Sequence, residues 1–145
     1  MDYLTIAHCF EMLHRRSQNF LVYASRDFQL TYSEYVLVLN LYECEGRSQD
    51  DIAACMYVDK AVVTRLIASL EKKKFIYRRR DIQDQRIKRL YLTEFGREQQ
   101  AFLENLPIRW IDTLTHDLDE EERIAMLTIF QKLANRAENV NFNQI

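Results

Sequence analysis

Glycine and proline are scarce in this sequence, with two Gly and one Pro among 145 residues, whereas average usage of the two together is about 12%. So few chain breakers argue against a turn-rich sandwich or barrel and predict long helices. They also leave no glycine-rich loop that could hold a nucleotide phosphate. The longest apolar run, Ile52–Val58, is far shorter than the roughly 20 residues of a membrane span, so we expect no membrane partner.

Cysteine is also sparse, and Cys9, Cys44 and Cys55 stand at unrelated spacings. An odd number of cysteines without a pattern is typical of a reducing compartment rather than of a disulfide scaffold. The sequence lacks the Cys-x-x-Cys and His-x-x-x-His patterns that indicate a metal site, and no nucleophile stands in an activating context. With no basic leader near Met1, we expect a cytoplasmic protein that is not an enzyme and has no cofactor.

The sequence does contain an unevenly distributed charge. The net charge is −2, yet residues 59–89 hold eleven basic and four acidic residues, a net +7, so the remainder carries −9. An acidic protein with one basic segment is typical of a polyanion binder, although a solvated charged face would have the same composition. The apolar share of 48% indicates a folded chain of about one domain.

Local signals predict mainly helices and one hairpin. Thr31 and Glu34 form a capping-box pattern, and Gly46 is a candidate end for the helix that they begin. Further caps stand at Ser48, Asp59, Thr93 and Asp119. We expect a kink or restart at Pro107. The expected helices cover 3–25, 31–46 and 60–73, with a short helix from Ser48 that includes Met56 and two more that begin at Thr93 and near Asp119 and include Leu114 and Ala134. The expected strands cover 75–80 and 87–92.

The helix over 60–73 has two contrasting faces. Its predicted buried side is apolar, whereas the opposite ridge is small and cationic: Lys60, Ala61, Thr64, Arg65 and Ala68. Small residues let a helix approach DNA bases, while Arg, Lys and Thr reach base edges and phosphates. Two neighbouring helices followed by a basic hairpin predict a winged helix-turn-helix, in which the second helix enters the major groove and the hairpin reaches the minor groove.

The terminal helices carry more apolar side chains than a monomer of this size would cover. We therefore expect a homodimer, with a dimerisation set of Leu4, Phe20, Leu127, Phe130 and Leu133. The expected organisation is a single domain over 1–145 with a DNA-binding core at 28–93 and dimerisation helices at 1–27 and 94–145. The fold class is mainly α.

Five short motifs resemble the MarR family of transcriptional regulators: Leu30–Tyr35, Val58–Ile67, Leu70–Arg78, Asp81–Arg86 and Leu92–Arg97. The resemblance implies a dimeric winged helix-turn-helix protein that binds a near-palindromic operator, most often as a repressor released by a ligand or by oxidation. It places Thr64 and Arg65 on the recognition helix and Arg86 of Asp84-Gln85-Arg86 in the minor groove. The family usually has glycine where Lys74 stands, so either this lysine is left-handed or the turn differs.

These inferences give a set of expected site residues. Asp84 would orient Arg86 or another basic residue, since a carboxylate beside phosphates would be repelled. The expected DNA-binding residues are Ser48, Lys60, Ala61, Thr64, Arg65, Ala68, Arg79, Arg86 and Lys88. A pocket for a small aromatic ligand, lined by Phe10, Leu13, Tyr32 and Tyr35, and ordinary packing of the same side chains are equally compatible with the sequence.

Two alternatives remain open at this stage. Cys9 resembles the N-terminal cysteine of a peroxide-sensing subfamily, but a small buried hydrophobe is the favoured interpretation; Cys44 and Cys55 are interpreted as core, or as partly exposed but inert. For the whole protein, the rival to a DNA-binding regulator is a helical protein-interaction module whose basic segment binds an acidic partner. Salt-dependent, sequence-selective DNA binding would separate the two.

Overall fold

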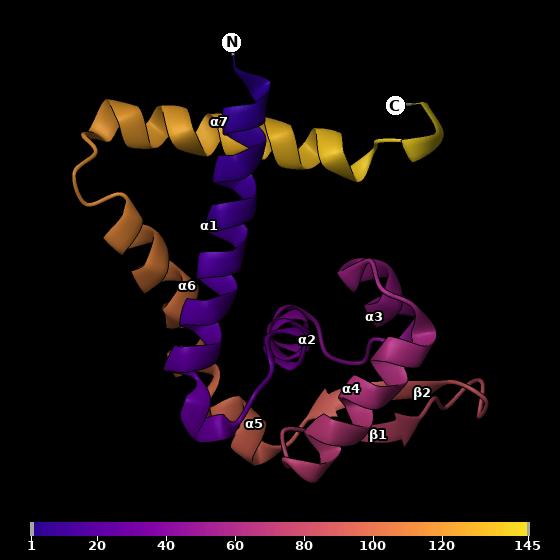
Figure 1. Ribbon diagram of the computed structural model, residues 1–145. Helices are drawn as coiled ribbons and strands as arrows, with labels where there is room; N and C mark the ends of the chain where they lie inside the picture. Colours follow the sequence, from indigo (N-terminus) through magenta and orange to yellow (C-terminus); the bar gives the residue numbers. More distant parts are fainter. Residues whose placement is uncertain (1, 145) are drawn as a thin grey trace. The chain divides into compact units, whose positions relative to one another are not determined.

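A computed structural model describes residues 2–144, which divide into two compact units, residues 2–110 and 111–144. Each unit is described by itself. The predicted fold class is confirmed: the chain is mainly helical with one small antiparallel sheet in a winged-helix arrangement (Figure 1). The first unit contains α1 (Tyr3–Ala24), η1 (Arg26–Phe28), α2 (Tyr32–Glu43), α3 (Gln49–Met56), α4 (Lys60–Lys72), β1 (Ile76–Arg80), β2 (Lys88–Leu92), α5 (Glu94–Glu98) and most of α6 (Gln100–Leu114). The second contains α7 (Glu120–Glu138) and η2 (Phe142–Gln144).

The helix starts follow the capping signals in the sequence. Thr31 and Glu34 form the predicted capping box of α2, and Asp119 and Glu122 form one for α7. Side chains of Ser48, Asp59 and Thr93 accept from backbone N–H groups of the third residue beyond them. Each cap satisfies one of the amides that a helix start leaves unpaired.

Two predicted helix limits are wrong. The helix that begins at Thr31 ends at Glu43 rather than at Gly46, because Cys44 is already extended. The helix that begins at Thr93 is interrupted at Gln99, and Pro107 lies inside α6. The helix restarts at Gln100, seven residues before Pro107, so the proline is not the cause of the interruption.

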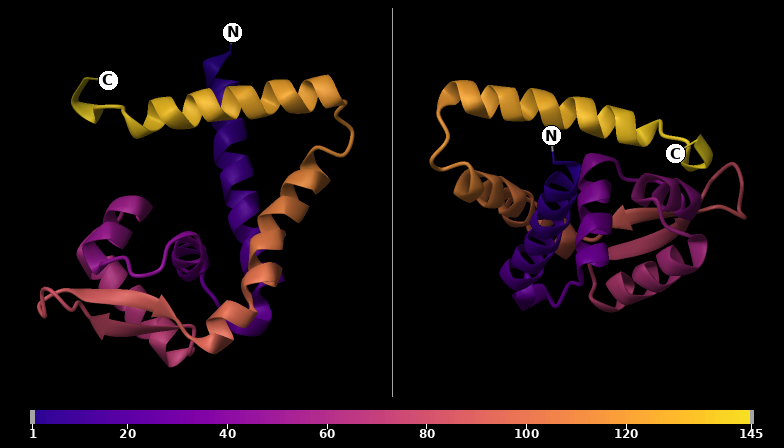
Figure 2. Two further views of the ribbon diagram at one scale, coloured as in Figure 1. Left: turned by 180° about the vertical axis from the view of Figure 1, so that it is seen from behind. Right: turned by 45° about the horizontal axis from the view of Figure 1, so that its top comes forward.

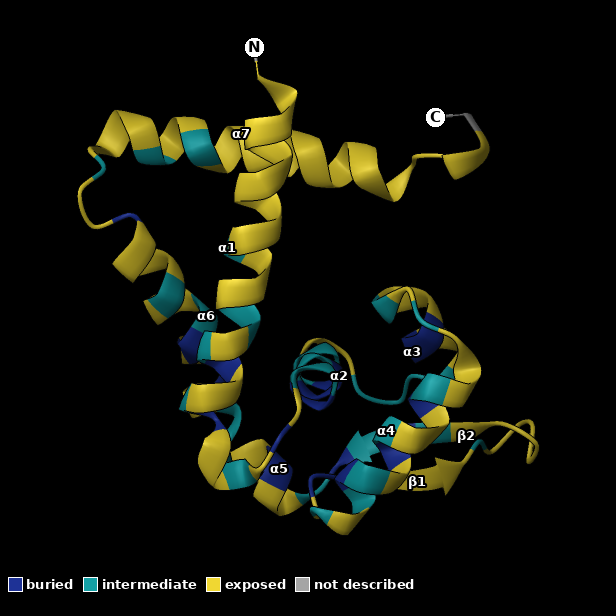
Figure 3. Cartoon of the chain, in the orientation of Figure 1, coloured by how far each residue is buried: buried dark blue, intermediate teal, exposed yellow. Residues whose placement is uncertain are grey.

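The core of the first unit surrounds α2. Leu37, Val38 and Leu41 are completely buried, and they pack with buried residues of α3, α4 and the two strands (Figure 3). In the sheet, Ile76 pairs with Leu92 and Arg78 with Leu90. This register turns Ile76, Leu90 and Leu92 toward the core. The apolar face of α4 is thereby held between α2 and the hairpin.

Two tyrosines of α2 connect the core to the segment that follows the hairpin. Pro107 has no N–H, so the carbonyl of Leu103, four residues earlier, lacks its intrahelical donor. The buried hydroxyl of Tyr35 donates to that carbonyl at 2.7 Å. The hydroxyl of Tyr42 donates to the carbonyl of Gly96 at 2.6 Å. Pro107 is therefore accommodated inside α6 because another helix supplies the missing donor.

An ion pair fixes the C-terminal end of α4. Nζ of Lys73 lies 2.6 Å from the Glu34 carboxylate and 2.6 Å from the backbone oxygen of Gln29. Burial alone would raise the pKa of Glu34, but hydrogen bonds from Lys73, Ser69 and the Thr31 amide hold it below its usual value. Lys74 follows in a left-handed conformation with φ 62°, which confirms that lysine adopts here a backbone geometry that glycine adopts more easily.

Candidate nucleic-acid interface

Helix α4 presents the ridge predicted from the sequence. Its inner face buries Val63, Ile67 and Leu70, which leaves the opposite side in solvent. All five predicted residues of that side are exposed: Lys60, Ala61, Thr64, Arg65 and Ala68. The surface is therefore low in the middle and cationic around it, as a helix that enters the DNA major groove requires.

The start of α3 contacts the start of α4. Nε2 of Gln49 lies 2.5 Å from Oγ1 of Thr64 and 3.2 Å from the backbone oxygen of Lys60. Nζ of Lys60 lies 3.0 Å from the Asp50 carboxylate. Sequence reasoning missed both Gln49 and Asp50. A polar residue just after the Ser48 cap was a visible signal, but its contact with α4 depends on the tertiary fold.

The hairpin projects beyond α3 and α4 as a basic arm, visible in both views of Figure 2. Its tip is ordered by Asp81, which accepts from the backbone N–H groups of Gln83 and Asp84 at 2.8 and 2.9 Å and forms an ion pair with Arg89. The Arg89 hydrogen bond, with these two amides, lowers the pKa of Asp81 to about 2. Asp81 is therefore ionised at neutral pH and supports the tip.

The predicted role of Asp84 needs correction. Its carboxylate accepts from the backbone N–H of Arg86 at 2.9 Å, so it shapes the turn through the main chain instead of orienting the guanidinium. The acid that orients a basic side chain of the hairpin is Asp81, with Arg89 as its partner. The sequence did not show this pair because Asp81 and Arg89 meet only when the two strands close.

The base of the hairpin is attached to the loop before α3. The amide of Gly46 donates to the Leu90 carbonyl at 2.8 Å, and the Leu90 amide donates to the Arg47 carbonyl at 3.0 Å. Nη1 of Arg89 donates to the Gly46 carbonyl at 2.8 Å. The loop therefore runs along β2 and joins the hairpin to α3, which explains why α2 ends before Gly46.

The basic residues of the segment fall into two groups. Lys73 and Arg78 are held by Glu34 and Glu71, the latter through two hydrogen bonds of 2.8 and 2.6 Å. Among the described residues 59–89, seven exposed cations form no ion pair with a carboxylate: Arg65, Lys72, Lys74, Arg79, Arg80, Arg86 and Lys88. They lie on α4, on the hairpin and in the turn between them, so this part of the surface carries an unneutralised positive charge.

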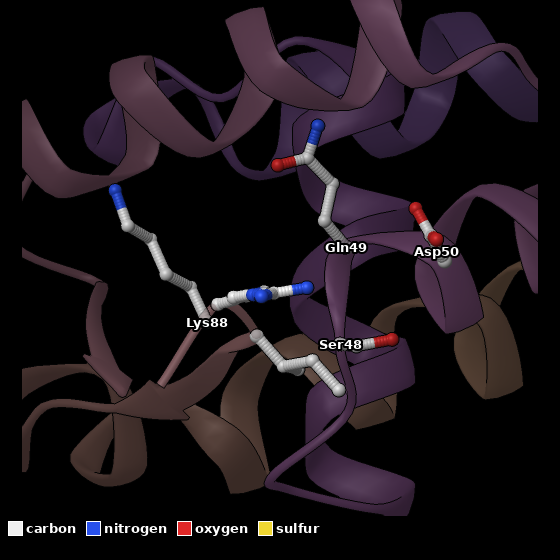
Figure 4. Close-up of a pocket in the computed structure, with 6 residues that line it drawn as sticks. Ser48, Gln49, Asp50 and Lys88 are labelled. Atoms are coloured by element: carbon white, nitrogen blue, oxygen red, sulfur yellow. The ribbon is translucent and has the colours of Figure 1, made fainter. Parts of the chain in front are cut away.

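A hollow of about 330 Å³ lies where α3 meets the hairpin, and it is lined by Ser48, Gln49, Asp50, Arg86, Ile87 and Lys88. The side chains of Gln49 and Lys88 extend in roughly the same direction from its walls (Figure 4). Three predicted DNA-binding residues, Ser48, Arg86 and Lys88, are thus brought together, although Ser48 is far from the other two in sequence.

The predicted dimerisation residues lie on two helices, α1 and α7. Leu4 on α1 and Leu127, Phe130 and Leu133 on α7 are 44–78% exposed. Phe20 is half-buried and stacks on Trp110, with ring centroids 5.0 Å apart. This position is partly covered by its own chain.

The structure also shows how far the predicted ligand-pocket residues and the three cysteines are buried. Tyr35 is 1% exposed and belongs to the core, so it does not line an open ligand pocket. Phe10 is exposed, and Leu13 and Tyr32 are half-buried. Cys9 is exposed, so its interpretation as a small buried hydrophobe is wrong. Cys44 and Cys55 are also exposed, which contradicts a place in the core but not their alternative interpretation as exposed side chains.

Among residues 2–144, no helix is long and apolar enough to span a membrane. Over the same residues, no group of three or more His, Cys, Asp or Glu side chains is arranged to hold a metal ion.

Comparison with known proteins places this geometry in a family. Residues 30–88 match the MarR family model. The chain is 29% identical over 111 residues to the uncharacterised HTH-type transcriptional regulator YdgJ of Bacillus subtilis, covering 77% of this chain and 68% of that protein. It is similar to the crystal structure of MarR, with a TM-score of 0.82 and 26% identity over 93% of this chain and 98% of that one. A Staphylococcus aureus MepR–DNA complex gives a TM-score of 0.79 and 27% identity over 90% and 96%.

These relatives agree with the non-enzymatic function expected from the sequence, because they are HTH-type transcriptional regulators and not enzymes. The matched segment contains α4 and most of the hairpin, where the unpaired cations lie. The chain belongs to the MarR family of winged helix-turn-helix transcriptional regulators.

Proposed function

We propose that this regulator acts in the cytoplasm as a homodimeric repressor that binds a near-palindromic operator. Helix α4 reads the major groove through Thr64 and Arg65, and the hairpin places Arg86 in the adjacent minor groove. The observation that carries this proposal is the set of exposed cations without carboxylate partners on α4 and the hairpin, on either side of a ridge kept low by Ala61 and Ala68. Phosphates provide the missing counter-charge.

The experiment that tests the function is selection of bound duplexes from a randomised DNA library, followed by titration of one selected duplex and one scrambled duplex. Enrichment of a two-fold related sequence and salt-dependent binding are expected. Binding to scrambled and selected duplexes with equal affinity would contradict sequence-specific regulation. Tight binding to an acidic protein partner without DNA selectivity would favour the alternative, a protein-interaction module.

Release of the DNA by a small aromatic ligand is part of the proposal. Tyr32 is half-buried on α2 and its ring contacts His14 of α1 edge-on, with ring centroids 6.1 Å apart. With Leu13 and Phe10 on the same helix as His14, Tyr32 gives the ligand an aromatic and apolar wall.

Assembly is proposed to use residues 1–27 and 94–145, with residues 28–93 as the DNA-binding core. Helix α7 contains no buried residue among its 19, and apolar side chains left in solvent favour association. We expect a dimer interface above roughly 2,000 Å², the range of permanent complexes. Sedimentation of the wild type at micromolar concentration is expected to give a dimer. Leu127→Glu should shift it toward monomer and Gln131→Glu should not; a wild type that stays monomeric would contradict the proposal.

Arg86→Ala is expected to weaken binding to selected and scrambled duplexes by similar factors. A narrow minor groove offers strong negative potential but little base information. The slope of log affinity against log salt should become shallower by about one, because one phosphate-neutralising charge is lost. Salt titrations by fluorescence anisotropy measure both effects. Arg26→Ala removes an exposed charge outside the interface and serves as control; equal slopes for both variants and the wild type would exclude the hairpin from the DNA contact.

A further inference from the structure

The side chain of Gln49 lies across the gap between α3 and α4 in a defined orientation. Its amide nitrogen is close to two oxygens, Oγ1 of Thr64 at 2.5 Å and the Lys60 carbonyl at 3.2 Å. The Thr64 hydroxyl in turn lies 2.8 Å from the Lys60 carbonyl. Lys60 and Thr64 are exposed on the recognition ridge, and Gln49 beside them is half-buried.

The direction of each hydrogen bond follows from chemistry. A backbone carbonyl only accepts, so the Gln49 NH₂ group, and not its oxygen, faces the Lys60 carbonyl. The single hydroxyl proton of Thr64 is donated to the same carbonyl, so the hydroxyl accepts from Gln49. Both amide protons and the hydroxyl proton are thereby used inside the protein.

The hydrogen-bonding groups that Gln49 and Thr64 can still offer to a ligand differ from those of a free glutamine and a free threonine. Gln49 keeps only its carbonyl oxygen Oε1, an acceptor. Thr64 keeps its methyl group and cannot donate. Gln49 also lines the hollow that contains Arg86 and Lys88, where a polyanion is attracted.

We propose that Gln49 is a specificity-determining residue of the DNA interface, one that accepts a hydrogen bond from an exocyclic amino group in the major groove. This inference rests on the proposed function. Adenine N6 and cytosine N4 present that donor, whereas guanine O6 and thymine O4 present acceptors. A keto group opposite Oε1 would bring two acceptors together, so the site selects adenine or cytosine over guanine or thymine at one position of the operator.

The anchoring also excludes the usual glutamine–adenine contact. That contact is bidentate and requires the NH₂ group to donate to adenine N7, but here the NH₂ group is held by α4. Thr64 then contributes its methyl group, which packs against the methyl group of thymine at a neighbouring position. Gln49 and Thr64 together recognise one base amino group and one thymine methyl group in the operator.

The test is selection from a duplex library randomised at each base pair, with wild-type protein, Gln49→Leu, Thr64→Val and Thr64→Ser. Wild type is expected to favour adenine or cytosine about ten-fold at one position. Gln49→Leu should lose this preference there and keep all others. Thr64→Val removes the oxygen that accepts one of the two Gln49 amide protons, so this proton becomes available to guanine O6 or thymine O4, and both bases should become acceptable at the same position.

Thr64→Ser is the matched control for Thr64→Val, because it retains the hydroxyl and loses the methyl group. Its amino-group preference should equal that of wild type. Replacing the contacted thymine by deoxyuridine should weaken wild-type binding about four-fold, as expected for loss of one buried methyl group, and leave Thr64→Ser unaffected. Thermal melting checks that each variant is folded.

Two results would contradict these proposals, each in a different way. If Gln49→Leu selects the same sequence with the same preference at every position, Gln49 does not read a base and the inference is wrong. If wild type itself selects no sequence, the proposed function fails, a result that is distinct from failure of the Gln49 assignment.

Discussion

Replacing both Thr64 and Arg65 by alanine is expected to reduce the affinity for a selected operator to nearly that for scrambled DNA. Arg65 is exposed on α4 and is not among the cations held by a carboxylate in the described residues, so its guanidinium is available for a base or a phosphate. One bidentate base contact contributes about 1–3 kcal/mol of discrimination. Loss of Thr64 also releases Gln49 from its hydrogen bond.

The expected loss on the operator is therefore at least 100-fold, out of a specific-to-non-specific ratio of roughly 10³ or more. Affinity for scrambled DNA should fall much less, by about the contribution of one charge. Anisotropy titrations on both duplexes give the ratio, and Lys72→Ala, which removes an exposed cation from the end of the same helix, is the control. An unchanged ratio in the double variant would mean that α4 does not read bases.

Gly96→Ala is expected to destabilise the fold by about 3 kcal/mol or more, near the upper end of single substitutions. A Cβ atom at Gly96 would lie 2.4 Å from the backbone oxygen of Phe75. That oxygen cannot move away easily, because it accepts from the Thr93 amide at 3.0 Å and from the Thr93 hydroxyl at 3.2 Å. The Gly96 carbonyl also accepts from Tyr42, which fixes the glycine from its other side.

Urea unfolding at constant protein concentration measures this effect, since association of the chain would shift the midpoint. A loss of 3 kcal/mol corresponds to a melting temperature lower by about 10 °C for a domain of this size. Glu98→Ala, at an exposed position of the same helix, should stay within about 0.5 kcal/mol of wild type. Equal stability of the two variants would show that the backbone around Phe75 yields to a methyl group.

Features that depend on a few adjacent residues could be predicted from the sequence. The caps at Thr31, Ser48 and Asp59 need only a side-chain oxygen and an amide three residues away. The ridge on α4 follows from helical periodicity. The predicted bounds of the two hairpin strands agree with the structure to within one residue, because alternating side chains and a polar tip are also local signals.

Features that depend on contacts between distant segments could not be predicted in this way. The end of α2 is set by pairing of residues 46 and 47 with Leu90. Pro107 is tolerated inside a helix because Tyr35 donates to Leu103 across 68 residues of sequence. Asp84, two residues from Arg86, was a reasonable partner by spacing, but the turn geometry gives that role to Asp81 with Arg89. The sequence did not indicate a role for Gln49, because that role depends on its contacts with Lys60 and Thr64 of another helix.

The hydrogen bonds between the loop before α3 and β2 also bear on how a signal can release DNA. Because Gly46, Arg47 and Leu90 are joined through their main chains, the base of the hairpin cannot swing independently of α3. Two such units in a dimer would then have to change their spacing by rigid-body rotation, each carrying its recognition helix and hairpin together. In the proposed dimer, an allosteric effector would therefore control the distance between two preformed half-site readers, and not the shape of either one.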